Sequence, residues 1–208
     1  MIKRKVTIVD YGCGNIFSLV RILEKKCNVR ISNIPEVIEK SDKVILPGVG
    51  SFQIGINNLK EKNIDQSLKI FLKKGNFLLG ICLGMQLLMD QSYEFGHYRG
   101  LGLIKGDVKK INYQNQFPIP HIGWNRIYSR TQDNLCPLLN RIKEKAYFYF
   151  IHSYKVETLN KMETLYEAKY GKECIPSIIN SNNIYGTQFH PEKSSRQGET
   201  MVENFLKF

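Results

Sequence analysis

The stretch Phe77-Leu78-Leu79-Gly80-Ile81-Cys82-Leu83-Gly84-Met85-Gln86 decides the fold of this chain, because an apolar run passes through Gly-x-Cys-x-Gly directly into helix-forming residues. The two glycines let the backbone turn sharply after a buried strand, which lifts the thiol of Cys82 clear of the sheet edge. A helix that begins at Leu83 directs its free N–H groups at the sulfur and favours the thiolate. An isolated cysteine is more often a small buried residue, but the flanking glycines predict a nucleophile at a strand–helix turn.

A second segment, Gly186-Thr187-Gln188-Phe189-His190-Pro191-Glu192-Lys193, supplies a candidate base for that nucleophile. In an extended chain, residues two apart point the same way, so Glu192 can accept a hydrogen bond from one nitrogen of His190. Pro191 fixes φ between them and disfavours a helix. The other ring nitrogen is then free for the thiol, and we predict a catalytic triad of Cys82, His190 and Glu192.

Short apolar segments alternate with amphipathic ones through the first half of the chain. Strands are predicted at 6–9, 29–32, 43–46 and 77–81, and helical periodicity at 16–25, 35–40 and 54–74. This alternation predicts a parallel sheet whose chemistry gathers at the carboxyl ends of its strands. Beyond residue 100, short strands at 101–111, 147–156, 165–169 and 177–180 predict an antiparallel extension. A strand-like segment at 184–189 leads into His190, and a helix at 197–206 closes the domain.

Composition narrows the class of protein further. The 208 residues hold no Pro-, Gly- or Ser-rich linker, so we predict a single domain over 1–208. The net charge of +11 comes from dispersed lysines, without a basic tract that would indicate nucleic-acid binding. No apolar run is long enough for a membrane span or a signal peptide, which predicts a cytoplasmic protein. The five cysteines are scattered without a Cys-x-x-Cys pair, so neither a disulfide framework nor a metal site is expected.

The two chemical motifs carry a family resemblance. Gly80-Ile81-Cys82-Leu83-Gly84-Met85-Gln86 together with Phe189-His190-Pro191-Glu192 resembles the class I (triad) glutamine amidotransferases. The resemblance implies hydrolysis of glutamine to glutamate and ammonia through a cysteine thioester, without a cofactor. It also implies a flavodoxin-like three-layer α/β fold, with a central, mostly parallel sheet, helices on both faces and an antiparallel extension.

Further segments resemble one branch of that family, the glutaminase subunits of imidazole glycerol phosphate synthase. They are Asp10-Tyr11-Gly12-Cys13-Gly14-Asn15, Pro47-Gly48-Val49-Gly50-Ser51-Phe52, His121-Ile122-Gly123-Trp124-Asn125 and His190-Pro191-Glu192-Lys193-Ser194. Anthranilate and GMP synthase glutaminases share the turn at Cys82 and the His-Pro-Glu, but lack the Asp-Tyr-Gly opening and the Gly-Trp-Asn.

The resemblance also implies roles for residues around the nucleophile. It places an oxyanion hole at the backbone N–H groups of Gly48 or Val49 and of Leu83, and substrate contacts at Gln86, Glu94, His152, Ser153 and Tyr154. Taken alone, the two-glycine turn after a strand also fits a simple β-turn. The alternating aromatic residues at 147–150 likewise fit plain sheet packing.

The chain offers no phosphate-binding glycine loop and no second catalytic cluster, so an acceptor protein for the ammonia is implied. The resemblance names it as a cyclase subunit, a (β/α)₈ barrel that forms a heterodimer with the glutaminase in histidine biosynthesis. Positions that match the docking face are Asn15, His121, Trp124, Tyr149 and Lys193, although a single tryptophan also fits a core position.

Two departures leave the partner open. Ile122 stands where histidine-pathway members more usually have methionine, and the segment 113–119 is long and polar. Relatives of this subunit serve sugar amidotransferases in surface-polysaccharide assembly, and that partner is the alternative. A non-catalytic scaffold is a further alternative, against which the complete set of Cys82, His190 and Glu192 speaks.

Overall fold

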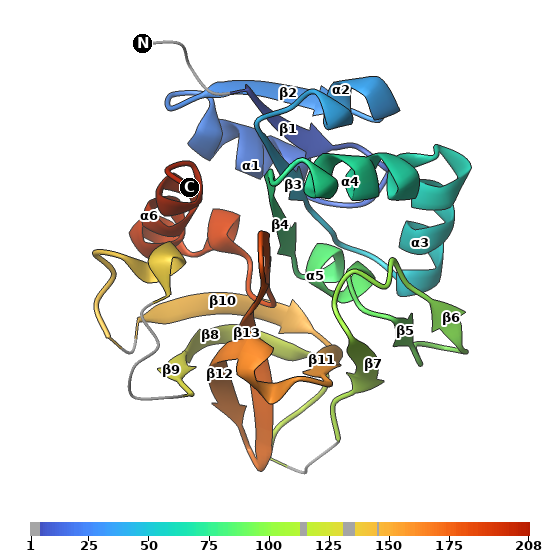
Figure 1. Cartoon of the computed structure of the whole chain (residues 1–208). Helices are drawn as coiled ribbons and strands as arrows, with labels where there is room; N and C mark the ends of the chain where they lie inside the picture. Colours follow the sequence, from blue (N-terminus) through green and yellow to red (C-terminus); the bar gives the residue numbers. More distant parts are fainter. Residues whose placement is uncertain (1–4, 113–115, 131–135, 145) are drawn as a thin grey trace.

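The central feature of the fold is one continuous mixed sheet, seen in a computed structural model that describes residues 5–112, 116–130, 136–144 and 146–208. Within these ranges its strand order is β2-β1-β3-β4-β14-β13-β12-β9 (Figure 1). The parallel part contains β1 (Lys5–Val9), β2 (Asn28–Ser32), β3 (Lys43–Leu46), β4 (Phe77–Ile81) and β14 (Ile184–Thr187). The antiparallel part contains β13 (Glu173–Ser181), β12 (Thr164–Tyr170) and β9 (Tyr128–Ser129). The predicted parallel sheet and its antiparallel extension are confirmed.

Helices cover both faces of the parallel part (Figure 1). One face carries α1 (Ile16–Leu23) and α6 (Ser195–Phe205). The other carries α2 (Pro35–Glu39), α3 (Phe52–Glu61), α4 (Ile64–Lys73) and α5 (Leu83–Leu87). The chain therefore has three layers, as the resemblance implied.

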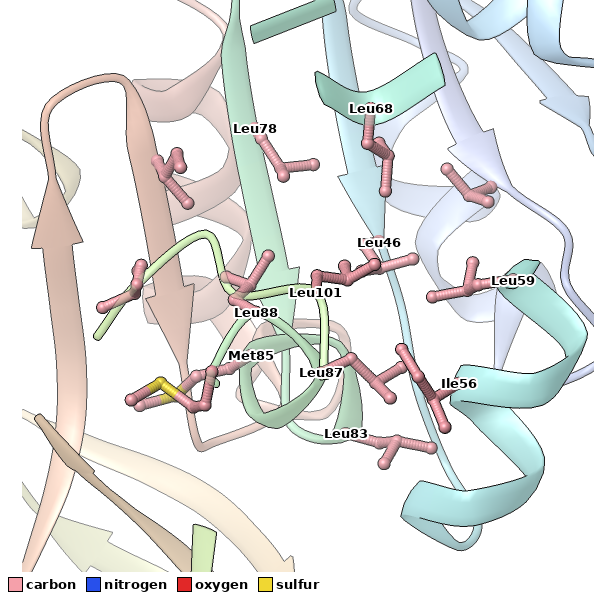
Figure 2. Close-up of a cluster of buried hydrophobic side chains, with 14 of the residues drawn as sticks. Leu46, Ile56, Leu59, Leu68, Leu78, Leu83, Met85, Leu87, Leu88 and Leu101 are labelled. Carbon is pink, nitrogen blue, oxygen red and sulfur yellow. The ribbon is translucent and has the colours of Figure 1, made fainter. Parts of the chain in front are cut away.

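The two cores between these layers follow from the alternation of side chains along a strand. In β3, Leu46 packs with residues of α2 to α5, whereas its neighbour Ile45 packs with residues of α1 and α6. Figure 2 shows the first of these cores, in which Leu46, Ile56 of α3 and Leu87 of α5 belong to one cluster of buried side chains. Every residue of β3 is buried, as expected for an inner parallel strand.

Several elements differ from the sequence-based prediction in their extent. The helical pattern at 54–74 is two helices, because Asn63 adopts the left-handed conformation with φ of 54° between α3 and α4. Asparagine tolerates that conformation better than most residues. The strand predicted at 101–111 shortens to β7 (Gly106–Lys110).

The strand predicted at 147–156 is divided at Ser153 into β10 (Tyr147–His152) and β11 (Tyr154–Thr158). The division has a topological reason. β10 pairs with β8 (His121–Arg126), a strand that the sequence pattern did not predict, whereas β11 joins a separate sheet with β7, β5 (Gln91–Ser92) and β6 (Tyr98–Arg99). Short 3₁₀ helices are η1 (Pro137–Leu139), η2 (Lys161–Glu163) and η3 (Pro191–Lys193).

Of the polar segment 113–119, residues 113–115 lie outside the described part of the chain. No helix among the described residues is long and apolar enough to cross a bilayer.

Candidate active site

Cys82 occupies a strained turn between β4 and α5. Its φ of 51° and ψ of −106° lie outside the regions that most L-residues adopt, and such strain is concentrated at functional sites. Both flanking glycines are required by close packing. A Cβ on Gly80 would lie 2.8 Å from the Gly84 carbonyl oxygen, and one on Gly84 would lie 1.9 Å from that of Leu46. The predicted strand, sharp turn and helix are all present, although α5 is only five residues long.

His190 and Glu192 lie beside this turn because β14 neighbours β4. The backbone N–H of Cys82 donates to the Thr187 carbonyl at 2.7 Å, and His190 follows Thr187 by three residues. The Nδ1 atom of His190 lies 2.7 Å from the Glu192 Oε1 atom, and both side chains are at most 2% exposed. The segment is not extended as predicted: Pro191 begins the 3₁₀ helix η3, a position where its fixed φ is tolerated.

The electrostatics of His190 depend on the sulfur. Burial by itself lowers the pKa of His190, but the nearby Cys82 sulfur and the Glu192 carboxylate together raise it to about 10. A histidine with this pKa holds its proton at neutral pH. The site therefore favours the imidazolium form of His190, between the Cys82 sulfur and the Glu192 carboxylate.

Gln188 is a neighbour of the sulfur to which the sequence assigned no role. Its Nε2 atom donates to the Cys82 Sγ atom at 3.6 Å, and its side chain is fully buried. The sulfur also lies 3.9 Å from the carbonyl oxygen of Ile151, in β10. A hydrogen bond donated to sulfur favours the thiolate. The spacing of Gln188 in the sequence does not indicate this contact, because Gln188 and Cys82 are 106 positions apart.

The Pro47–Gly50 turn lies against the start of α5. A Cβ on Gly48 would be 2.6 Å from both the Leu83 Cβ and the Gly84 nitrogen, so the structure brings Gly48 and Leu83 together. Val49 is 48% exposed at the same turn. Tyr11, to which the sequence assigned no role, donates its hydroxyl to the Pro47 carbonyl at 2.6 Å. Burial, followed by the nearby Cys13 and Cys82, raises the pKa of Tyr11, so it stays a neutral donor.

Two of the side chains expected to contact substrate, Gln86 and His152, form hydrogen bonds with other residues of the chain. Gln86 is buried and its Nε2 atom donates to the Tyr154 carbonyl at 3.0 Å and to the Gln188 Oε1 atom at 3.3 Å. His152 also bonds to the Tyr154 carbonyl, and Ser153 joins β10 to β11. These residues are brought together beside Cys82.

Glu94 takes a different position, at the first turn of α3. Its Oε2 atom accepts a hydrogen bond from the backbone N–H of Phe52. Burial raises the pKa of Glu94, and the Phe52 N–H opposes part of that rise.

Three of the residues expected at a docking face form one surface cluster. The Trp124 and Tyr149 rings meet edge to face with centroids 6.1 Å apart, and the Lys193 Nζ atom lies 5.7 Å from the centre of the Tyr149 ring. Trp124 is 50% exposed, so its side chain is not in the core. Asn15 precedes α1, which contacts η3. His121 is only 3% exposed and lies beneath this surface rather than on it, because inward and outward residues alternate along β8.

The described part of the chain contains no group of three or more His, Cys, Asp or Glu residues placed to hold a metal ion. The arrangement around Cys82 instead combines a thiol with a buried imidazole–carboxylate pair, the types of group that acyl transfer by a cysteine nucleophile needs.

Comparison with known proteins gives this site a context. The family model for class I glutamine amidotransferases matches residues 7–208. The chain is 43% identical to imidazole glycerol phosphate synthase subunit HisH 1 of Methanococcus maripaludis, covering 97% of this chain and 98% of that protein. It is 39% identical to the HisH subunit of Bacillus velezensis, covering 97% and 95%.

Solved structures agree on the fold. The structure of PurLQS from Thermotoga maritima superimposes with a TM-score of 0.75 at 20% identity, covering 99% of each chain. The glutaminase domain of Trypanosoma brucei CTPS with bound acivicin superimposes with a TM-score of 0.67 at 14% identity, covering 98% of this chain and 94% of that one. The full-length relatives and the family model together show that the chain belongs to the class I glutamine amidotransferases, and within them to the HisH subunits of imidazole glycerol phosphate synthase.

Proposed function

We propose that this chain is a glutaminase subunit, which hydrolyses glutamine to glutamate and ammonia and passes the ammonia to a cyclase subunit that makes imidazole glycerol phosphate. The observation that carries the proposal is the convergence of Cys82 and the His190–Glu192 pair at the ends of the adjacent parallel strands β4 and β14. The full-length identity to HisH subunits supports the choice of pathway.

In the first half of the reaction, the Cys82 thiolate attacks the side-chain carbonyl carbon of glutamine. The carbonyl oxygen becomes an oxyanion, which is stabilised by backbone N–H groups at Gly48 or Val49 and at Leu83. When the C–N bond breaks, the nitrogen leaves as ammonia with the proton that His190 held. The product on the enzyme is a γ-glutamyl thioester of Cys82.

In the second half, the charge on His190 changes with the charge on sulfur. The thioester sulfur is neutral, so one of the causes that raised the pKa of His190 is gone, and burial now favours the neutral ring. The neutral ring takes a proton from water, whose oxygen attacks the thioester carbon. The C–S bond then breaks, glutamate leaves, and the Cys82 thiolate and the His190 imidazolium are restored. Glu192 holds the ring by its Nδ1 atom throughout.

The cyclase subunit needs a docking face on the surface of this chain. The cluster of Trp124, Tyr149 and Lys193 places two aromatic rings beside a cation on one face, and Trp and Tyr are residue types enriched in binding hot spots. We assign this face to a cyclase with a (β/α)₈ barrel, in a cytoplasmic heterodimer. The chain contributes to it as a single domain.

The test is release of glutamate by the purified chain with a cyclase subunit from the same genome, comparing the native protein with Cys82→Ala and with Cys174→Ala. Cys174 is exposed and lies on β13, so its loss should leave the rate unchanged. Loss of glutamate release in Cys82→Ala alone supports the proposal. Equal rates in the native protein and Cys82→Ala would overturn it.

A further inference from the structure

Two buried histidines face each other outside the triad. His121 in β8 and His152 in β10 are direct partners in the antiparallel register, and they are 3% and 6% exposed. The His121 Nδ1 atom lies 3.1 Å from the His152 Nε2 atom. The His121 ring also stacks on Phe150, with centroids 4.9 Å apart, and packs on Tyr170 at 4.0 Å. Two imidazoles thus occupy buried positions next to aromatic side chains.

The hydrogen bonds of this pair specify where each proton lies. The Tyr154 carbonyl can only accept, so the His152 Nδ1 atom, 2.8 Å away, must carry a proton and donate it. Burial lowers the pKa of His152 to about 3 and that of His121 to about 4, so both rings are neutral. The His152 Nε2 atom is then an acceptor, and the His121 Nδ1 atom must donate to it. The His121 Nε2 atom is left to accept from the Asn125 amide at 3.3 Å.

The directed chain ends at the Tyr154 carbonyl, and a second series of hydrogen bonds connects this carbonyl to the nucleophile. The Tyr154 carbonyl that accepts from His152 also accepts from the Gln86 Nε2 atom at 3.0 Å. The same Gln86 nitrogen donates to the Gln188 Oε1 atom at 3.3 Å, and the Gln188 Nε2 atom donates to the Cys82 Sγ atom at 3.6 Å. Each member of the series is held by the one before it, from β8 to the sulfur.

The outer end of the series lies next to the exposed side of β8. Asn125 is anchored by a second hydrogen bond, from its Nδ2 atom to the Lys169 carbonyl at 2.9 Å. Its neighbour Trp124 points the opposite way and is half exposed. Trp124 on the outer face and His121 on the inner face belong to the same strand, so a movement of β8 also moves the His121 ring.

We propose that His121 and His152 are positioning residues, whose neutral, Nδ1-protonated rings hold Gln86 and Gln188 in place against Cys82. The inference rests on the proposed glutaminase function and adds to it two residues that touch neither the sulfur nor the His190–Glu192 pair through a hydrogen bond. Their role is to fix the Tyr154 carbonyl and, through it, the donor that faces the thiolate.

The first test separates hydrogen bonding from packing. His121→Phe keeps a ring between Phe150 and Tyr170 but removes the donor to His152, whereas His121→Asn loses the ring and keeps an amide N–H near the Nδ1 position. The same pair of changes at His152 keeps or removes the donor to Tyr154. We expect the phenylalanine variants to lose about tenfold in kcat/KM for glutamine in the complex with the cyclase, and the asparagine variants to lose less. The opposite order would show that the rings only fill space, and would overturn the inference.

The second test does not depend on glutaminase activity. Cys82 alkylation by iodoacetamide, followed on its own peptide by mass spectrometry, should slow in the two phenylalanine variants relative to the asparagine variants. If the native complex releases no glutamate but this difference is present, the proposed function fails and the positioning role stands. Equal alkylation rates in all four variants would overturn the positioning role.

The third test reads the protons themselves in the native chain. The sequence holds four histidines, so ¹⁵N spectra of the imidazoles are simple to assign with the variants above. We expect His121 and His152 to be neutral at pH 7, each with its proton on Nδ1. A proton on Nε2 of either ring, or a doubly protonated ring, would contradict the directed chain whatever the variants do.

Discussion

Replacing Glu192 with glutamine tests the electrostatic design of the site most sharply. The change keeps the size of the side chain and removes its charge, at a position where both partners of the 2.7 Å bond to His190 are at most 2% exposed. A buried hydrogen bond to a charged group contributes ~1.5–3 kcal/mol. Because ~1.4 kcal/mol is a factor of ten, loss of the charge alone should lower the ratio of protonated to neutral His190 by about 10- to 150-fold.

A second effect enlarges the loss. The glutamine amide can donate to the Nδ1 atom of His190, which moves the ring proton to Nε2 and leaves the ring unable to act as a base toward water. An equivalent tautomer error in a serine protease triad costs about 10⁴ in kcat. We therefore expect Glu192→Gln to lower kcat for glutamine hydrolysis by about 10² to 10⁴, with little change in KM, because Glu192 is buried behind the ring.

The assay is steady-state glutamate release in the presence of the cyclase subunit, with thermal melting to confirm folding. Glu199→Gln on the exposed side of α6 is the matched control and should have native kinetics. Glu192→Asp keeps the charge and should recover part of the rate. A Glu192→Gln variant that retains more than about a third of native kcat would refute the role assigned to this carboxylate.

Three further changes probe the turn, the buried histidines and the docking face. Gly48→Ala places a Cβ 2.6 Å from the Leu83 Cβ and should lower kcat about 10²-fold by displacing an oxyanion donor. The control is Gly55→Ala, whose Cβ meets the flexible Leu87 side chain at 3.2 Å and should leave kcat unchanged. Similar kinetics for the two variants would count against the oxyanion assignment. Burial lowers the pKa values of His121 and His152 to about 4 and about 3. As the pH falls below 6.5, these two histidines therefore bind protons in the unfolded chain before they do so in the folded chain. The free energy of unfolding is thus highest above pH 6.5 and falls as the pH drops toward 4. Denaturant unfolding of His152→Asn should show a fall smaller by about 3 kcal/mol over that interval, and a fall equal to that of the native chain would contradict the neutral state. Trp124→Ala should weaken cyclase binding by about 2 kcal/mol in titration calorimetry, and the exposed Ile54→Ala on α3 should leave it unchanged; no effect of Trp124→Ala would remove the aromatic cluster from the interface.

The sequence predicts the parallel half of this fold well because that half depends on local signals. Apolar strands such as 43–46 are buried on both faces, so they form continuous apolar runs in the sequence. The glycines on either side of Cys82 are required by close backbone contacts at the turn itself, so they lie next to the cysteine in the sequence. Asn63 shows the limit of such signals. One asparagine in the left-handed conformation divides a continuous helical pattern without altering its periodicity.

The parts that the sequence missed depend on contacts between distant segments. Strand β8 carries alternating inward and outward residues, but its pairing with β10 brings together segments that are separated in the chain. The role of Gln188 at the sulfur arises only because β14 lies beside β4, and the His121–His152 pair exists only in that antiparallel register. Side chains that act through such pairings carry no spacing signal of their own.

The most direct test of the central claim is glutamate release by the purified chain, alone and with a histidine-pathway cyclase from the same organism, with and without the nucleotide ligand of the cyclase. The account predicts a strong rise in glutamate release with the cyclase and its ligand, abolished by Cys82→Ala. A barrel that neither binds nor stimulates the chain would contradict the assigned partner and favour a sugar amidotransferase, and release that survives Cys82→Ala would contradict the chemistry itself.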